Sequence, residues 1–208
     1  MAGFITLNAQ NLNTEMDKVS YSLGVNIATS FKQQGWELDA KTLATAISDV
    51  IDGNKLAISE QDANTILQSY QQKLMNKTLE ANSEAGKAFL EENAKREEVI
   101  TTSTGLQYEV LIEGAGESPK ATDEVKVHYH GTLIDGRVFD SSVERGQPAT
   151  FGVTQVIKGW TEALQLMKTG AKYKLFIPSD LAYGERGASQ MIGPNTTLIF
   201  EVELISIN

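Results

Sequence analysis

Apolar residues recur with a helical period along the first hundred residues. Thr14 stands three positions before Asp17, a pattern typical of a capped helix start. Apolar side chains then follow at helical spacing at Met16, Val19, Leu23, Ile27 and Phe31. Asp39 caps a second predicted helix, which ends near Gly53. Its apolar face consists of Leu43, Ile47, Val50 and Ile51.

A third helix is predicted to start at Ser59 and to run to about Ala94, with Gly86 as its weak point. About 35 residues at 1.5 Å each give roughly 50 Å of helix. Its apolar residues cluster in the first third, at Ile66, Leu67, Tyr70, Leu74 and Met75, and the remainder is mostly polar.

These segments provide a thin core for one chain. One interpretation is a small three-helix bundle. The other is that two chains interleave their helices and the polar stretch forms an exposed rod. We favour the dimer, because segments of ~60 residues seldom bury enough surface alone.

From Leu106 the hydrophobic period changes to two, which predicts strands. Leu106, Tyr108 and Val110 alternate with Gln107 and Glu109, and a similar alternation follows Val125. Residues 133–139 predict a hairpin with an Asp-Gly turn, and residues 160–167 predict a short helix ending at Gly170. Further strands are expected over 171–177 and 197–207, the last with Leu198, Phe200, Val202 and Leu204 on one face. The pattern predicts an antiparallel sheet wrapped around one helix, an α+β domain.

Composition and charge exclude several classes of function. The net charge of -9 is spread over both halves, because residues 1–100 carry 9 basic and 14 acidic groups and residues 101–208 carry 9 and 13. An acidic surface argues against nucleic acid or an anionic membrane as the main partner. No cysteine is present, which excludes disulfides and thiolate metal sites, and no apolar run approaches the roughly 20 residues of a membrane span.

The first residues lack the basic region and the long apolar stretch of a signal peptide. We therefore expect a cytoplasmic protein. A periplasmic location is the alternative, if a signal was removed from a longer precursor.

Five motifs stand in order along the second half, at 127–133, 135–142, 156–160, 181–184 and 197–204. Together they resemble an FKBP-type peptidyl-prolyl cis-trans isomerase domain over about residues 103–208. The helical half, through residues 17–24 and 86–93, is similar to the bacterial two-domain members of the Mip and FklB types. The resemblance implies an FKBP-like α+β fold and isomerase activity.

Such an enzyme needs neither a nucleophile nor a cofactor. Rotation about the X–Pro bond meets a barrier of roughly 18–20 kcal/mol because the amide loses conjugation, yet no bond breaks. A dry apolar pocket that binds the twisted amide selectively is what the reaction requires. The resemblance assigns pocket residues to Tyr129, Phe139, Phe151, Val156, Ile157, Ile192 and Phe200.

Three further residues receive catalytic roles from the resemblance. Trp160 is expected as the floor under the proline ring, and Asp140 as a carboxylate facing the substrate carbonyl region. The Tyr183 hydroxyl and the Ile157 backbone N–H are expected to donate hydrogen bonds to substrate carbonyls. Ala149 and Ala188 stand where the family often has an aromatic residue and a histidine. Affinity for macrolide inhibitors such as tacrolimus and rapamycin, and the X–Pro preference, therefore stay open.

Other side-chain groupings favour plain structural roles. His128 and His130 form an H-x-H pair on one strand face, which could bind a metal but lacks an evident third ligand. A solvated strand face explains the pair, and we expect no metal. Ser141 and Ser142 lie beside Asp140 without a motif that supplies a base, so a turn role is favoured over a nucleophile.

The predicted organisation has three parts: a helical dimerisation domain at 1–60, a long connecting helix and linker at 61–102, and an isomerase domain at 103–208. We expect a V-shaped homodimer that accelerates X–Pro isomerisation in unfolded or folding proteins and holds such clients as a chaperone does. The alternative is chiefly a holdase chaperone or a peptide-binding module with incidental isomerase activity.

Overall fold

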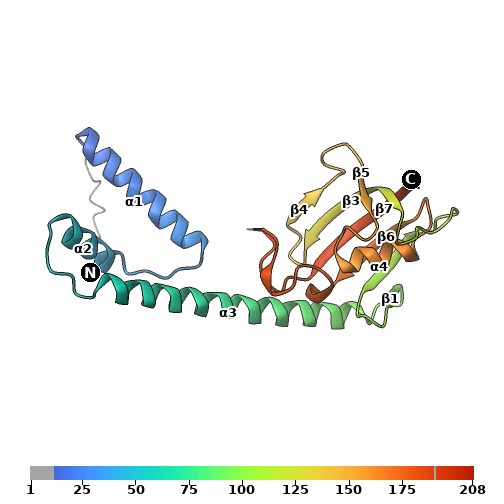
Figure 1. The fold of residues 1–208 in the computed structure, drawn as a ribbon, viewed down its shortest axis with the longest axis horizontal. Helices are drawn as coiled ribbons and strands as arrows, with labels where there is room; N and C mark the ends of the chain where they lie inside the picture. The colour runs from blue at the N-terminus through green and yellow to red at the C-terminus, as the bar shows by residue number, and fades with distance from the viewer. Residues whose placement is uncertain (1–11, 190) are drawn as a thin grey trace, which may run out of the picture. The chain divides into compact units, whose positions relative to one another are not determined.

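The computed structural model describes residues 12–189 and 191–208. The chain divides into two compact units, one up to Leu74 and the other Met75–Asn208, so that the division falls within a single long helix (Figure 1). The described elements, in chain order, are α1 (Glu15–Gln33), α2 (Ala40–Ile51), α3 (Glu60–Asn93), β1 (Val99–Thr101), β2 (Gln107–Ile112), β3 (Glu124–Leu133), β4 (Val138–Ser141), β5 (Ala149–Gly152), α4 (Lys158–Leu166), β6 (Lys172–Ile177), η1 (Ser179–Leu181), η2 (Gly184–Arg186) and β7 (Leu198–Ile207).

The three predicted helix starts of the first unit are confirmed. The Thr14 hydroxyl accepts the Asp17 amide hydrogen at 3.0 Å, and the Asp17 carboxylate accepts the Thr14 amide hydrogen at 2.8 Å. Asp39 accepts a backbone hydrogen bond at 2.6 Å at the start of α2, and Ser59 accepts one at 3.0 Å at the start of α3. These caps satisfy amide groups that the helices themselves leave unpaired.

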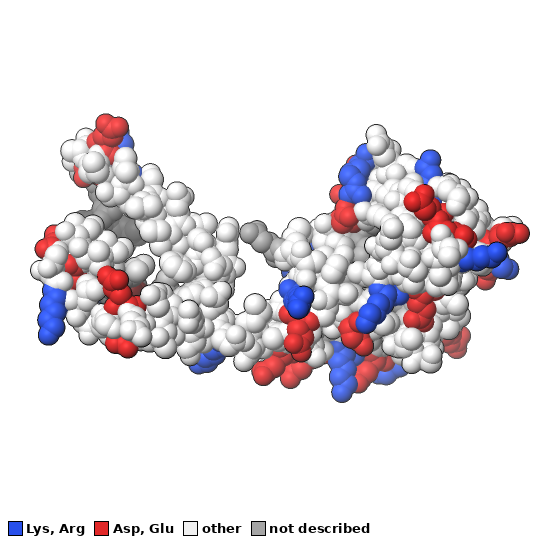
Figure 2. Space-filling view, viewed as in Figure 1, with Lys and Arg blue, Asp and Glu red and all other residues white. Residues whose placement is uncertain are grey.

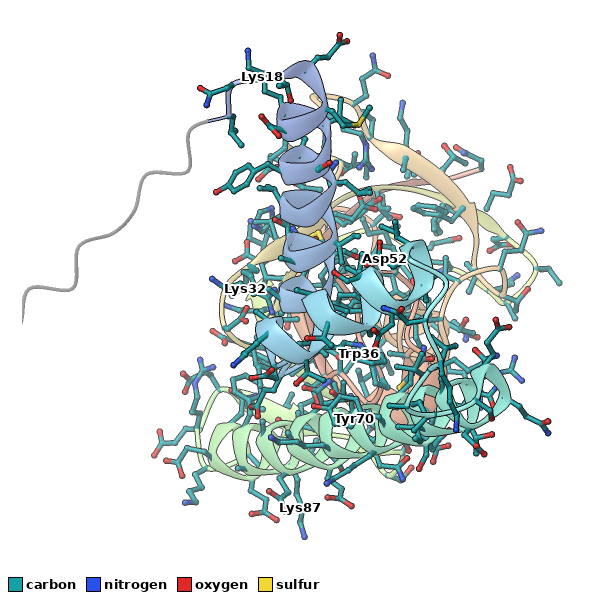
Figure 3. All side chains as sticks on the ribbon, turned by 90° about the vertical axis from the view of Figure 1, so that its left-hand side faces the viewer. Lys18, Lys32, Trp36, Asp52, Tyr70 and Lys87 are labelled. Atoms are coloured by element: carbon teal, nitrogen blue, oxygen red, sulfur yellow. The ribbon has the colours of Figure 1, made fainter. Side chains whose placement is uncertain are left out.

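The first unit has little interior of its own. No side chain of α1 or α2 is buried. An aromatic cluster connects α1, the loop that follows it, and α3: the Phe31 and Trp36 rings lie 5.3 Å apart, and the Trp36 and Tyr70 rings 5.1 Å apart. Figure 3 shows Trp36 and Tyr70 at this junction. The thin core expected from the sequence is thus what the structure has.

The second unit contains an antiparallel sheet with strand order β1-β2-β6-β7-β3-β4, and β5 pairs with β3. The inward face of β7 consists, as predicted, of Leu198, Phe200, Val202 and Leu204. Helix α4 lies against this face and contributes Trp160, Ala163 and Leu164 to the core (Figure 1). The α+β fold class is confirmed.

Three details differ from the sequence prediction. Strand β1 lies in the stretch expected to be a linker, and β5 follows a segment with no strand signal; both are too short for an alternating pattern to be visible. Helix α4 begins two residues earlier than expected, at Lys158. None of the helices in the described ranges combines the length and apolar composition needed to cross a membrane.

The last turns of α3 are not the exposed polar rod that one interpretation of the sequence gave. Gln107, expected on the polar face of β2, is 4% exposed because α3 covers it. Its side chain accepts a hydrogen bond from Asn93 at 2.8 Å and donates one to the Leu90 carbonyl at 2.9 Å. Phe89 also packs on Phe176, with ring centroids 5.9 Å apart. The end of α3 is therefore part of the second unit.

Candidate active site

A cavity of about 580 Å³ lies in the second unit. Every residue that the resemblance assigned to the pocket lines it: Tyr129, Phe139, Asp140, Phe151, Val156, Ile157, Trp160, Tyr183, Ile192 and Phe200. Gln155, Ala188 and Ser189 complete the lining, and sequence reasoning had given Gln155 and Ser189 no role. Ala149 packs against the core without lining the cavity.

Trp160 lies in the first turn of α4 and is 4% exposed. Its indole meets three other aromatic rings nearly edge-on, with centroid distances of 5.4 Å to Tyr129, 5.9 Å to Phe151 and 5.2 Å to Phe200. Such edge-to-face packing holds each ring in place. The buried Trp160 Nε1 has no acceptor among the described residues. The cavity therefore has a rigid, apolar and aromatic surface.

One wall depends on a glycine. Phe139 and Phe200 pack edge to face with centroids 5.3 Å apart, beside Gly131 on β3. A Cβ added to Gly131 would lie 2.7 Å from the Phe139 ring and 2.9 Å from the Phe200 ring. Both rings lie so close to the β3 backbone that a side chain at position 131 would overlap them. Gly131 lies within the motif at 127–133, but nothing in the sequence indicates this contact.

We expect Gly131→Ala to displace both rings and so to narrow or distort the cavity. Overpacking of this kind costs about 1–3 kcal/mol of stability. Thermal unfolding should show that loss, and the isomerase activity that the resemblance implies should fall by more than the unfolded fraction explains. A matched change, Gly136→Ala in the β3–β4 turn, has no neighbouring atom within 4 Å of the added Cβ, although its positive φ adds local strain. It should leave activity per folded molecule unchanged; equal losses in the two variants would contradict the role of Gly131.

A polar cluster forms one edge of the cavity. The Tyr129 hydroxyl donates a hydrogen bond to Asp140 Oδ2 at 2.5 Å, and Arg145 Nη2 donates one to the Tyr129 oxygen at 2.7 Å. Arg145 Nη1 also forms an ion pair with Asp140 Oδ1, and the guanidinium lies 5.5 Å from the Tyr129 ring centroid. Arg145 had no predicted role, because it lies five residues after Asp140 in an irregular loop without a motif.

The cluster fixes the charge states of its members. Burial by itself would raise the pKa of Asp140, but hydrogen bonds from Tyr129 and Arg145 and the Arg145 charge outweigh it, so this pKa is below its usual value. Burial, and then the neighbouring Asp140 carboxylate, raise the pKa of Tyr129. Asp140 is therefore ionised and Tyr129 neutral at physiological pH.

Two hydrogen-bond donors at the cavity are available to a ligand. Ile157 occupies the N-cap position of α4 in an extended conformation, and its amide hydrogen has no acceptor among the described residues. Tyr183 is 41% exposed at the cavity, and its hydroxyl likewise has no hydrogen-bond partner among the described residues. A bound peptide could use both donors at no cost in protein hydrogen bonds.

The loop before β7 carries Ile192 into the cavity. The Ser189 hydroxyl accepts the Ile192 amide hydrogen at 3.2 Å, and the Ala188 amide donates to the Ile192 carbonyl at 2.9 Å. Ile192 is 6% exposed. Ser189 thus holds the chain that presents this wall.

The two histidines of β3 form separate hydrogen bonds with the two serines at the end of β4 and directly after it. His128 Nδ1 lies 3.1 Å from the Ser142 hydroxyl, and His130 Nδ1 lies 3.0 Å from the Ser141 hydroxyl. Ser141 also accepts the Glu144 amide hydrogen at 3.1 Å, which is the turn role expected for it. No group of three or more metal-ligating side chains is found within the described residues.

Comparison with known proteins finds two families, which match successive parts of the chain. Residues 16–110 match the family described as the domain amino-terminal to FKBP-type peptidyl-prolyl isomerase, and residues 115–205 match the FKBP-type peptidyl-prolyl cis-trans isomerase family.

Relatives match nearly the whole chain. The outer membrane protein MIP of Legionella longbeachae is 44% identical over 96% of this chain and 89% of its own length. The FKBP-type 22 kDa peptidyl-prolyl cis-trans isomerase of Escherichia coli is 44% identical over 91% of this chain and 94% of its own. The crystal structure of FkpA from Escherichia coli, 39% identical, superimposes with a TM-score of 0.76 over 95% of this chain and 98% of the other. The aromatic cavity and these matches agree, and the chain belongs to the FKBP-type peptidyl-prolyl cis-trans isomerases.

Proposed function

We propose that the aromatic cavity of the second unit binds the prolyl ring and catalyses rotation about the X–Pro bond. The main support for this proposal is that ten residues, from different positions between 129 and 200 in the sequence, all line one cavity. An apolar floor and walls favour the prolyl ring and exclude water. A water-poor site also favours the twisted amide, which has lost conjugation and charge separation relative to the planar one.

The polar groups then have distinct roles. The Ile157 amide and the Tyr183 hydroxyl donate hydrogen bonds to carbonyls of the substrate and fix the chain on either side of the rotating bond. Asp140, kept ionised by Arg145 and Tyr129, presents a fixed negative charge beside the carbonyl that rotates. Fixed charges of this kind stabilise a changed charge distribution without reorganisation. The test is a protease-coupled assay of a proline peptide with cavity variants of the full chain.

The charge states predict a broad pH profile. We expect kcat/KM of the wild type to be flat between about pH 5 and 9, because Asp140 stays ionised and Tyr129 protonated throughout. Since the Asp140 pKa is lowered, its contribution to stability is present above the unfolded value of about 3.9 and is lost as the pH falls through the lower folded value. NMR exchange spectroscopy of a proline peptide measures the rate without a coupling protease.

Arg145→Met should move the acid limb of that profile to higher pH, because the variant removes both a hydrogen-bond donor and a positive charge from Asp140 and so raises its pKa. Arg137→Met removes the guanidinium from Asp135, an ion pair with a nitrogen–oxygen distance of 2.8 Å outside the cavity. That control should keep the wild-type profile. An unmoved acid limb in the Arg145 variant would contradict the proposed role of the pair.

We further propose that the first unit forms a homodimer. Its apolar side chains are exposed on every helix: Leu23 on α1 is 59% exposed and Ile51 on α2 is 77% exposed. No charged residue occurs between Lys18 and Lys32, and Figure 2 shows a largely uncharged surface along α1. Water-exposed apolar surface of this extent is unfavourable in a single chain and is typical of an interface. A second copy of the same helices supplies a self-complementary partner.

Client binding beyond the prolyl bond is part of the same proposal. Two linked cavities raise the effective concentration of a second binding site for an unfolded chain without any new contact. The substrates are then proline-containing unfolded or folding proteins, for which prolyl isomerisation limits folding.

One comparison distinguishes the proposed isomerase from the alternative, a holdase chaperone with incidental isomerase activity. A variant with a disabled cavity should still suppress aggregation of an unfolded protein without prolines if holding is the main function. If suppression needs the cavity as well as the dimer, isomerisation and holding are one activity.

Macrolides offer a second probe of the cavity. We propose tacrolimus and rapamycin as ligands, because the lining is aromatic and concave. Ala188 lines one side with a single methyl group and leaves that side without an aromatic contact. Ala188→His is a direct test of whether this position limits affinity.

The compartment in which the enzyme acts stays a prediction.

A further inference from the structure

The end of α3 is bonded to the loop that carries the cavity wall. Asn82 of α3 donates a hydrogen bond from Nδ2 to the Pro194 carbonyl at 2.7 Å, and the same nitrogen lies 3.4 Å from the Thr196 hydroxyl. Asn82 is half-buried, and the bonded residues are more than a hundred positions away in sequence. Pro194 and Thr196 follow Ile192, which lines the cavity.

The contact between α3 and this part of the chain is close as well as polar. A Cβ on Gly86, one turn after Asn82, would overlap the Thr197 hydroxyl at the start of β7. Gly86 is buried within α3, where glycine is otherwise unfavourable relative to alanine. The helix therefore approaches the base of the loop to a distance that only glycine permits.

Backbone hydrogen bonds within this part of the chain connect the residues near Asn195, which α3 contacts, to the residues that line the cavity. The Asn195 amide donates to the Gly184 carbonyl at 2.9 Å, and the Ala188 amide donates to the Ile192 carbonyl at 2.9 Å. Asn195 adopts a left-handed conformation with φ of 52°. Gly184 directly follows Tyr183, one of the two available donors at the cavity.

We propose that Asn82 is a positioning residue of the isomerase: it holds the loop between η2 and β7 so that Ile192 and Tyr183 are in place before substrate arrives. This inference rests on the assignment of the cavity as the active site. When the bond is lost, only part of the population has Ile192 and Tyr183 in place, and apparent substrate affinity falls by that fraction. Since the loop contributes to binding in both ground and transition states, KM rises while kcat stays nearly constant.

The chain provides a matched control on the same helix. Asn93 also donates from Nδ2 to the second unit, but its acceptor is Gln107 on β2 and not the loop. Asn82→Asp and Asn93→Asp therefore remove the same kind of donor from α3 at nearly the same size and shape. A merely structural role of Asn82 would make the two variants behave alike.

The experiment compares these two full-length variants with the wild type in the peptide isomerase assay and in hydrogen exchange measured by mass spectrometry. Asn82→Asp should raise KM about three- to tenfold with kcat changed less than about twofold. Exchange of the amides between residues 184 and 197 should accelerate, because the loop opens locally. Asn93→Asp should lower the melting temperature and leave KM and loop exchange unchanged.

An unchanged KM and unchanged loop exchange in a folded Asn82→Asp protein would overturn the inference, as would an equal rise of KM in Asn93→Asp. Asn82→Ala, which removes the donor without placing a carboxylate beside the Pro194 carbonyl, is the second variant if the first does not fold. Failure of the cavity assignment is recognised separately: substitutions at Asp140 and Trp160 would then leave activity intact, whatever Asn82 does.

Discussion

Replacing Asp140 by Ala and Trp160 by Leu together is expected to lower kcat/KM for a proline peptide by at least about 100-fold. In the proposed site Trp160 is the apolar floor under the prolyl ring, and leucine cannot offer the same flat surface. In the same proposal Asp140 supplies a fixed charge beside the rotating carbonyl, and alanine removes it. Both losses act on the transition state, so that kcat should fall and not only KM.

The double variant should nevertheless stay folded. The Asp140 and Arg145 side chains are 44% and 52% exposed, and exposed ion pairs contribute about 0–1 kcal/mol. The Trp160 indole N–H makes no hydrogen bond with the described residues, so leucine leaves no acceptor unpaired. The remaining cost is lost packing of a large side chain, at most about 3–5 kcal/mol by analogy with Trp→Ala changes. Circular dichroism and thermal unfolding check this.

The chain contains a matched pair of control positions. Trp36 is the other tryptophan and lies in the first unit, and Asp135 forms an ion pair with Arg137 outside the cavity. Trp36→Leu combined with Asp135→Ala changes the same residue types and should keep wild-type rates on a short peptide. Near wild-type activity of the Asp140/Trp160 variant would remove the basis of the active-site assignment.

Much of this architecture could be predicted from local patterns. Thr14, Asp39 and Ser59 each stand one residue before a helix because a side-chain oxygen accepts a hydrogen bond that the first turn cannot satisfy. Period-two alternation predicted strands β3 and β7, because one face of the sheet packs against α4. The ten cavity residues could be assigned only through the ordered motifs of the family, because an aromatic residue in a strand looks the same whether it packs in a core or lines a pocket.

Contacts between distant segments could not be predicted in this way. Gln107 has the position of an exposed residue in an alternating strand and is buried only because the end of α3 bonds to it. Arg145 acts through Tyr129 and Asp140, and Gly131 through two rings on other strands. In each case the partner is brought near by the fold, and the residue's own neighbours in sequence give no indication of it.

The second large effect is expected from the exposed apolar surface of α1. Val19 and Leu23 lie one turn apart on the same side of the helix and are 54% and 59% exposed. Burying such a side chain fully contributes about 1.5–3 kcal/mol, and each copy of a symmetric dimer contributes both residues. Glutamate at these positions would have to be buried next to the same charge from the partner, which is strongly unfavourable.

The full-length protein should therefore sediment as a dimer at micromolar concentration, and Val19→Glu combined with Leu23→Glu should sediment as a monomer. Activity on a short peptide should stay close to wild type, because the cavity lies wholly in the second unit. Suppression of aggregation should fall sharply, because the monomer offers only one cavity to an unfolded chain.

Ser22→Glu combined with Thr29→Glu adds the same two charges to α1 at polar positions on another side of the helix, and should leave the dimer intact. The comparison separates charge from position: net charge changes equally in both variants, while only Val19 and Leu23 lie on the proposed interface. If both variants dissociate, general repulsion between acidic chains explains the result and this apolar side of α1 is not the interface. If neither dissociates while the wild type is a dimer, the contact is made by other elements. A wild type that sediments as a monomer would contradict the proposed homodimer.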